Sequence, residues 1–350
     1  MSKGPSPFEL SVSRGFGEWL AEQKITLVFT TYQAGKVFFI GSQDDGRLAI
    51  HERSIARCMG LHVDGDALWL ASRYQLWRFQ NALEDGQRHS GYDRLYVPQV
   101  GYTTGYVDTH DVAIDADGQP LFVATAFNCV ATTTTTHSLR PVWRPPWISK
   151  IVAEDRCHLN GMALANGRLA YATAVSQSDV IDAWRDRRRD GGVLIDTDAD
   201  EVICGGLSMP HSPRVQVRDG KRRVWLLEAG RGQLGYVDPG QGFEAVSFCP
   251  GFARGLHLYD RFAVVGLSAA RENRTFDDLE FGERLTELDT DARCGLHVVD
   301  LETGNTIHWV RIEGVVRELY DVAVLPGVRR AMAIGFKGDE IERVITLDSN

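Results

Sequence analysis

Three polar residues that bind metals in proteins recur at one position of a repeated hairpin. The segments "HDVAIDADGQPLFVAT", "NGMALANGRLAYAT" and "HSPRVQVRDGKRRVWLLE" begin with His110, Asn160 and His211. Two imidazole nitrogens and an amide oxygen, with an open position for water, suit Zn²⁺ or another borderline divalent metal. Such a metal lowers the pKa of its bound water into the neutral range. The pattern therefore predicts a metal site at His110, Asn160 and His211 with water activation as its chemistry; the alternative is that these residues only cap turns.

Charged residues close to these positions extend the candidate site. Asp111 and Glu318 are the carboxylates expected to complete the metal shell or to act as a base. Arg254 and Arg214 are expected to bind a carboxylate or phosphate of the ligand. An internal salt bridge with an aspartate such as Asp111 or Asp321 is the alternative role for these arginines.

The stretch "EDRCHLN" directly precedes the repeated position at Asn160. His158 and Asp155 are expected to orient Asn160 or His110 from behind, since ligating groups need outer partners. Their alternative role is to support the loop. Cys157 is a candidate soft ligand or nucleophile, although nothing nearby in the sequence indicates a lowered pKa.

The repeat itself defines the elements that position these residues. Each copy is a strand hairpin followed by two further strand-like runs, and successive copies start 43 to 66 residues apart. This is the spacing of four-stranded propeller blades with connecting loops. The residue before each innermost strand faces the central axis, so Tyr320 becomes a further catalytic candidate. The rim residues, as we call this aligned set, are Met59, His110, Asn160, His211, Arg254 and Tyr320.

We therefore expect an all-β fold, with residues 1–350 forming a single β-propeller domain. An additional meander from Thr26 and a closing strand from "FELSVS" favour seven blades, and six is the alternative if the meander is shared between neighbours. A short helix is expected at about 13–23. Insert loops are expected at about 131–148, 176–190 and 271–292. The first carries "RPVWRPPW" and forms either one wall of a pocket or a cover over a blade edge.

Composition excludes several classes of function. The formal net charge of −9 argues against a nucleic acid partner. The basic cluster "WRDRRRD" at 184–190 is interleaved with aspartates, which favours a solvated loop. We find neither an apolar run of membrane length nor a secretory signal, so we expect a cytoplasmic protein that does not bind membranes. The six scattered cysteines fit reduced thiols in a core.

Several stretches resemble an uncharacterised bacterial propeller family of conserved hypothetical proteins. They are "TTYQAGK", "WRPPWISKIVAEDRCHLNGMA", "MPHSPR" and "GFARGLHL". This resemblance implies a propeller and no reaction. More distantly, "HLNGMALANGRLAYA" is similar to the strand start of gluconolactonase-like and strictosidine synthase-like propellers, which implies a tunnel metal bound by Asn160. His211 stands where those families have an aspartate, which favours a transition metal over calcium.

These observations lead to one preferred function and two alternatives. We expect a metal-dependent enzyme with a site at the mouth of the tunnel, hydrolysing a small anionic or lactone-type substrate held by Arg254 or Arg214. A metal-dependent lyase or oxidoreductase is the second possibility. The third is a propeller that binds a ligand or a protein partner without catalysis, because this fold hosts all of these functions.

Overall fold

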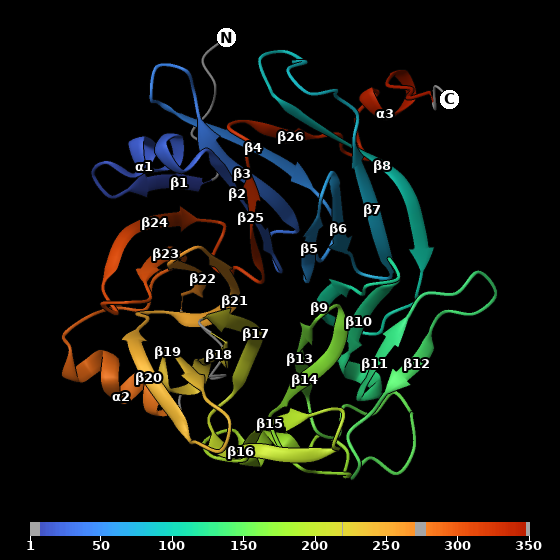
Figure 1. Ribbon diagram of the computed structural model, residues 1–350, viewed down its shortest axis with the longest axis vertical. Coiled ribbons are helices and arrows are strands. Elements are labelled where there is room, and N and C mark those ends of the chain that lie inside the picture. Colours follow the sequence, from blue (N-terminus) through green and yellow to red (C-terminus); the bar gives the residue numbers. More distant parts are fainter. Residues whose placement is uncertain (1–7, 219, 270–277, 348–350) are drawn as a thin grey trace.

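The computed structural model describes residues 8–218, 220–269 and 278–347. In these ranges the strands form six sheets, arranged as a ring around a central axis (Figure 1). Each innermost strand contacts the next around the axis, and the last contacts the first, so the ring is closed. The predicted all-β propeller is confirmed. It has six blades, the alternative number, instead of the favoured seven.

Every blade contains four antiparallel strands, which are consecutive in the chain in five blades, whereas the sixth combines β25 with β2–β4. The innermost strands are β5 (Leu61–Asp64), β9 (Thr109–Ile114), β13 (Leu159–Ala165), β17 (Pro210–Arg218), β21 (Phe252–Tyr259) and β25 (Val322–Pro326). The second strands are β6 (Ala67–Ala71), β10 (Pro120–Ala124), β14 (Arg168–Ala174), β18 (Lys221–Glu228), β22 (Phe262–Ser268) and β2 (Ile25–Thr31). The third strands are β7 (Gln75–Asn81), β11 (Cys129–Thr132), β15 (Gly192–Asp196), β19 (Gln233–Val237), β23 (Gly295–Asp300) and β3 (Lys36–Ser42). The outer strands are β8 (Arg94–Thr103), β12 (Arg140–Trp143), β16 (Glu201–Leu207), β20 (Phe243–Phe248), β24 (Thr306–Gly314) and β4 (Leu48–Ser54).

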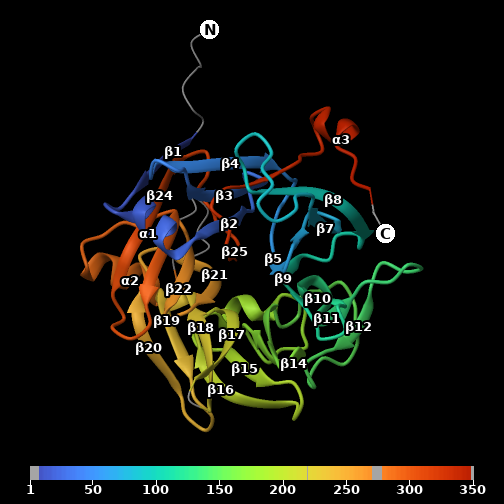
Figure 2. The same cartoon turned by 45° about the horizontal axis from the view of Figure 1, so that its top comes forward.

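The two ends of the chain close the ring together, which explains the blade number. The meander β2–β4 has no inner strand of its own and pairs with β25 from the last repeat. Figure 2 shows β25 beside these N-terminal strands from a second direction. The strand predicted from "FELSVS", β1 (Phe8–Val12), adds a fifth strand to the β21 blade by pairing with β24. Strand β26 (Ala331–Ala333) pairs with β8 in parallel. The meander and the last repeat therefore make one blade instead of two.

Burial explains the strand patterns in the sequence. Second strands such as β2, β6, β10 and β22 are buried along their whole length, because both faces of each blade pack against neighbouring blades. Such strands appear as continuous apolar runs. Outer strands such as β1 and β24 alternate between less and more exposed residues. The core is correspondingly divided into apolar clusters between adjacent blades, for example between the β9 and β13 blades around Val123 and Ala172.

Helices and inserts lie outside the sheets. Helix α1 (Phe16–Gln23) packs Phe16, Trp19 and Leu20 against the β21 and β25 blades. Segment 131–148 contains β12, and segment 176–190 contains the 3₁₀ helix η2 (Ala183–Arg187). In segment 271–292, residues 271–277 lie outside the described residues, and the rest contains α2 (Glu280–Glu287). The remaining short helices are η1 (Thr125–Phe127), η3 (Ala229–Arg231) and α3 (Glu340–Arg343). None of the helices in the described ranges has the length and apolar character needed to cross a membrane.

Glycines follow three of the rim residues because the inner strands converge at the axis. A Cβ on Gly161 would lie 2.5 Å from the Pro213 ring, and one on Gly255 would lie 2.6 Å from the Asp321 backbone. Gly255 also has a φ of +77°, which side-chain-bearing residues rarely adopt. The "NG" and "RG" pairs in the repeat therefore reflect close backbone contact.

Three charged residues near the middle of the tunnel connect all six innermost strands. Asp111 of β9 accepts from the Met162 amide of β13 at 3.1 Å and from the Arg214 guanidinium of β17 at 2.9 Å. Arg214 also donates to the Leu256 carbonyl of β21 at 2.9 Å. Asp321, directly before β25, accepts from the Leu61 amide of β5 at 2.9 Å and lies 3.8 Å from Arg214. We call Asp111, Arg214 and Asp321 the axial clasp.

The axial clasp divides the tunnel into two compartments. On the side toward the strand ends, all six innermost strands line a cavity of about 260 Å³ that includes His62 and His257. On the side where the strands begin, a separate cavity is lined by rim residues. The two cavities have no lining residue in common.

Removal of the clasp arginine should destabilise the whole ring. We expect Arg214→Met to lower the free energy of unfolding by about 3–5 kcal/mol, because two buried carboxylates lose their cation. The measurement is urea unfolding monitored by circular dichroism. Arg218→Met, on the same strand but with a side chain 61% exposed, is the control and should cost less than about 1 kcal/mol. Equal effects of the two variants would show that the clasp is not important for stability.

The clasp should also make stability depend on pH. Burial raises the pKa of Asp321 to about 7, with Arg214 opposing and Asp111 adding to the shift. A raised carboxyl pKa favours the folded state below about pH 4, and this contribution is lost as the pH rises toward 7. We expect the unfolding free energy of the parent to fall between pH 4 and 7 relative to Asp321→Asn. Parallel urea-unfolding curves across this range would contradict the assignment.

Candidate functional site

The cavity at the beginning of the innermost strands has a volume of about 230 Å³. We call it the mouth cavity. It is lined by five of the predicted site residues, His110, Asp155, His158, Arg254 and Tyr320. The repeat alignment therefore brings together polar side chains that are far apart in the chain.

A recurring backbone conformation directs several of these side chains. At the residue two positions before four of the rim residues, φ is positive although none is glycine: Arg57 (50°), Asp108 (56°), His158 (51°) and Met209 (47°). This left-handed conformation costs about 1 kcal/mol per residue and persists only where surrounding contacts enforce it. Asp108, His158 and Met209 all line the mouth cavity. The strained turn thus places a second set of side chains in the cavity, beside the rim residues themselves.

His158 has a carboxylate partner that sets its orientation. Its Nδ1 donates to Asp155 Oδ2 at 2.9 Å. The indole N–H of Trp184 donates to the same oxygen at 3.1 Å, and the Trp184 and His158 rings stack at 4.0 Å. The pKa of Asp155 is lowered, since His158 and its hydrogen bond outweigh the opposing effect of burial, which is the largest single cause. This arrangement leaves Nε2 of His158 as the nitrogen able to accept a proton.

His110 lies against His158 and Tyr320, with ring centroids at 5.0 and 5.4 Å. Its Nδ1 donates to the Asp108 carbonyl at 2.8 Å, so Nε2 carries the lone pair. Burial lowers the pKa of His110 to about 4. The imidazole is therefore neutral at pH 7 and available as a ligand or as a hydrogen-bond acceptor.

Three polar atoms near His110 are buried without a hydrogen-bond partner among the described residues. They are Nε2 of His211, the amide nitrogen of Asn160 and the hydroxyl of Tyr320. His211 is parallel to His110 at 6.4 Å, and burial, followed by the charge of Arg254, lowers its pKa well below the usual value. Asn160 uses its amide oxygen to accept from Thr173 at 2.9 Å. Of these three residues only Tyr320 lines the mouth cavity; Asn160 and His211 are not part of its lining. Because unpartnered buried polar atoms are costly, a polar ligand that reached them would be stabilised.

Cations surround the mouth cavity. The Arg254 guanidinium lies over the rings of Phe252 and Tyr320, at 5.0 and 5.4 Å from their centroids. Arg185 and Arg188 from segment 176–190 also line the cavity. Two carboxylates, Asp108 and Asp155, line it as well. Burial raises the pKa of Tyr320 well above 10, so its phenol stays protonated. The cavity therefore contains guanidinium groups and a phenol that can donate a hydrogen bond.

Other predicted residues lie elsewhere. Asp111 and Arg214 form the axial clasp, so the internal salt bridge that the sequence left open is what the structure contains. Glu318 is buried but does not line the mouth cavity. Burial raises the pKa of the Cys157 thiol, which argues against a nucleophile there. Within the described ranges, no group of three or more His, Cys, Asp and Glu side chains is arranged to hold a metal. The predicted ligand set of His110, Asn160 and His211 contains only two residues of these four types, so the absence of such a group does not test it and it stays a prediction.

Sequence reasoning missed several residues of the mouth cavity, including Trp184, Arg185, Arg188 and Asp108. Asp108 was detectable, because it stands two positions before a rim residue, as His158 does. The alternation of arginines and aspartates in "WRDRRRD" favours a solvated loop. Trp184 and two of its arginines nevertheless line the cavity, a placement that depends on how the segment packs.

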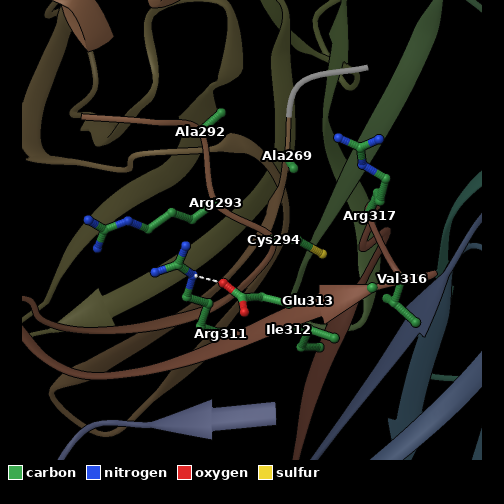
Figure 3. Close-up of a pocket in the computed structure, with 10 residues that line it drawn as sticks. Ala269, Ala292, Arg293, Cys294, Arg311, Ile312, Glu313, Val316 and Arg317 are labelled. Carbon is green, nitrogen blue, oxygen red and sulfur yellow. Dashed lines mark ion pairs between the residues drawn. The ribbon is translucent and has the colours of Figure 1, made fainter. Parts of the chain in front are cut away.

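A cavity on the flank of the β21 blade offers different chemistry. It has a volume of about 320 Å³ and exposes Arg293, Arg311 and Arg317 around the buried Cys294 (Figure 3). Arg311 pairs with Glu313 at 2.9 Å. Burial raises the pKa of Cys294 to about 12, so the thiol stays protonated. Because this cavity lacks an imidazole, we place the candidate site at the mouth of the tunnel.

The fold and site define a six-bladed propeller with a cavity lined by histidine, aspartate and arginine side chains at one end of its tunnel. The chain belongs to a family described as a domain of unknown function, DUF4915, which matches residues 14–334. The predicted membership of an uncharacterised propeller family is thereby confirmed. A comparison with curated proteins finds no match.

Solved structures of other propellers are similar to this chain at low identity. A catalytically inactive virginiamycin B lyase from Staphylococcus aureus, with quinupristin, is 11% identical with a TM-score of 0.42, covering 87% of this chain and 99% of that chain. Regucalcin from Agrobacterium tumefaciens, a calcium-binding protein, is 12% identical with a TM-score of 0.43, covering 84% and 92%. A putative gluconolactonase is 10% identical with a TM-score of 0.49, covering 80% and 91%. Similarity at this level assigns neither an activity nor a ligand to this chain.

Proposed function

We propose that the protein is an enzyme that cleaves a small anionic or lactone-type substrate in the mouth cavity, with His158 as general base. The observation that supports this most strongly is the His158–Asp155 pair, held at 2.9 Å beside a cavity. A carboxylate that binds one imidazole nitrogen fixes the ring and stabilises the imidazolium that forms when the other nitrogen takes a proton.

Three polar groups of the cavity have roles in lactone hydrolysis. Nε2 of His158 removes a proton from water as the water oxygen bonds to the lactone carbonyl carbon. The Tyr320 hydroxyl donates a hydrogen bond to the oxyanion that develops, and Arg254 binds the anionic group of the substrate. The ring C–O bond then breaks, and the proton on His158 passes to the leaving alkoxide. In a lyase, the same nitrogen would remove a proton from carbon, and the leaving group would depart with its bonding electrons.

A metal bound by His110, Asn160 and His211 is the second candidate, although only His110 of these three residues lines the mouth cavity. Nε2 of His211 and one amide atom of Asn160 are buried without partners, and Nε2 of His110 is unprotonated. Rotation of the Asn160 amide would present its oxygen and keep the contact with Thr173, whose hydroxyl both donates and accepts. These residues fit Zn²⁺ or another transition metal better than calcium. Such an ion would lower the pKa of a bound water.

Loss of the base should remove catalysis and preserve binding. A panel of γ- and δ-lactones, assayed by proton release, tests hydrolysis, and carboxylates with a β-leaving group, assayed by the absorbance of the new double bond, test elimination. We expect His158→Gln to lower kcat about 10²–10⁴-fold. Arg254→Met should raise KM, because the anion loses its cation. His137→Gln, on an exposed loop, is the control.

Two results would contradict this proposal. Full activity of His158→Gln would exclude His158 as the base. Binding of lactones or carboxylates by the parent, without turnover of any compound in either assay, would favour the non-catalytic propeller.

The metal prediction has its own test. We expect elemental analysis of the purified protein to find about one equivalent of a transition metal, and none in His110→Ala/His211→Ala if that variant remains folded. His62→Ala/His257→Ala, in the other compartment of the tunnel, should keep the metal. A parent that binds no Zn²⁺ even after reconstitution would eliminate the metal site and leave the acid–base proposal intact.

A further inference from the structure

Segment 176–190 contributes more to the candidate site than its position outside the sheets suggests. Its 3₁₀ helix η2 carries Trp184, which is 6% exposed. The mechanism above assigns no role to this segment, yet Trp184 contacts both members of the His158–Asp155 pair.

Trp184 is held on both faces and at its edge. His158 stacks on the ring at 4.0 Å with an interplanar angle of 23°, and the Arg185 guanidinium lies 4.4 Å from the ring centroid. At such short distances from one centroid, the two groups must occupy opposite faces. The indole N–H donates to Asp155 at 3.1 Å. A substrate therefore cannot stack on Trp184, and the residue acts on the site through His158 and Asp155.

The segment is anchored to the same loop by a second contact. Arg156, between Asp155 and His158 in sequence, is 8% exposed and donates to Asp179 at 2.6 Å and to Glu154 at 2.5 Å. Hydrogen bonding to Ser149 and Arg156 lowers the pKa of Asp179 to about 2. The ion pair is therefore complete at neutral pH, and it joins segment 176–190 to the loop that carries the proposed base.

Apolar packing holds Trp184 from behind. It belongs to a buried cluster with Met209, Phe252, Leu279 and Phe281, contributed by two blades and by the segment that contains α2. The backbone of Asp155 and His158 is in the left-handed region, with φ of 41° and 51°. Backbone hydrogen bonds to Ala126 and from Val175 hold this strained loop, and Trp184 adds a side-chain contact to each of the two residues.

We propose that Trp184 is a positioning residue that fixes the orientation of the His158 imidazole, and that segment 176–190 is built to hold it there. The inference rests on the proposed function of His158. The ring contact restrains the imidazole plane, and the indole N–H restrains the carboxylate that fixes Nδ1. Misplacement of a reacting group by about 1 Å can lower a rate about 100-fold.

Two substitutions separate the contributions of Trp184. Trp184→Leu removes the ring contact and the N–H, and we expect kcat on the best lactone or carboxylate of the panel to fall about 100-fold with little change in KM. Trp184→Phe keeps an aromatic ring over His158 and loses only the N–H, so we expect a loss of about 10-fold. Trp309→Leu, on the outer strand β24 with 37% exposure, is the control.

A double-variant cycle distinguishes positioning from a general structural effect. If Trp184 acts through His158, His158→Gln/Trp184→Leu should be no slower than His158→Gln alone. Additive losses would overturn the inference. Unchanged kcat in Trp184→Leu, alongside a large loss in His158→Gln, would overturn it too and leave the proposed function standing.

The orientation of His158 is also measurable without a substrate. NMR spectra of protein with isotope-labelled histidine should show one His158 tautomer, with the proton on Nδ1, in the parent and in Trp309→Leu. In Trp184→Leu, we expect the His158 signals to broaden or to average between tautomers. Identical His158 signals in all three proteins would contradict the inference, whether or not any compound of the panel is turned over. Should Trp184→Leu fail to fold, the intermediate effect expected of Trp184→Phe provides the test.

Discussion

The pairing of Arg214 with two buried aspartates at the axis is the contact on which the rest of the structure depends. Six sheets in a ring bury their apolar faces against each other, but that burial is nondirectional and does not fix the height of one inner strand relative to the next. Asp111, Arg214 and Asp321 make directional bonds to backbone atoms of the other inner strands. A shift of one strand along the axis would break a buried charged hydrogen bond, so the clasp sets the register of the blades.

That register explains why a site forms where the strands begin. With the strands aligned, the same turn of each blade reaches the same height, and the left-handed residues at Asp108, His158 and Met209 direct their side chains into one cavity. Contacts at these turns come from the same blade, where the Ala229 amide donates to the Met209 carbonyl, and from the preceding blade, where the Asp155 amide donates to the Ala126 carbonyl. The stable contacts in the middle of the tunnel thus offset the cost of the strained backbone turns at its mouth.

Sequence patterns predicted which segments form strands better than they predicted which strands and side chains contact each other. Periodic hairpins identified the propeller and the rim residues, because strand alternation and turn residues are local properties. The blade number was left between a favoured seven and an alternative six, since pairing of β2 with β25 joins opposite ends of the chain and leaves no local signal; the structure has six. Arg214 was ambiguous for the same reason: a guanidinium three residues after the rim residue His211 can face a ligand or an aspartate of another blade. Trp184 was missed because its placement depends on packing against Phe252 and Phe281.

The charge of the mouth cavity opposes that of the whole protein. The chain has a formal net charge of −9, which repels anions at long range. Three guanidinium groups nevertheless line the cavity, those of Arg185, Arg188 and Arg254, together with two carboxylates. One of these carboxylates, Asp155, accepts hydrogen bonds from His158 and Trp184. Arg185 pairs with Asp182 at 3.1 Å and Arg188 lies 3.5 Å from Asp278, so part of this positive charge is balanced by carboxylates outside the cavity lining. Because these two arginines of segment 176–190 already have carboxylate partners, an anionic substrate would have to compete with Asp182 and Asp278 for them, and these pairs, each with an exposed carboxylate, are weak enough to exchange.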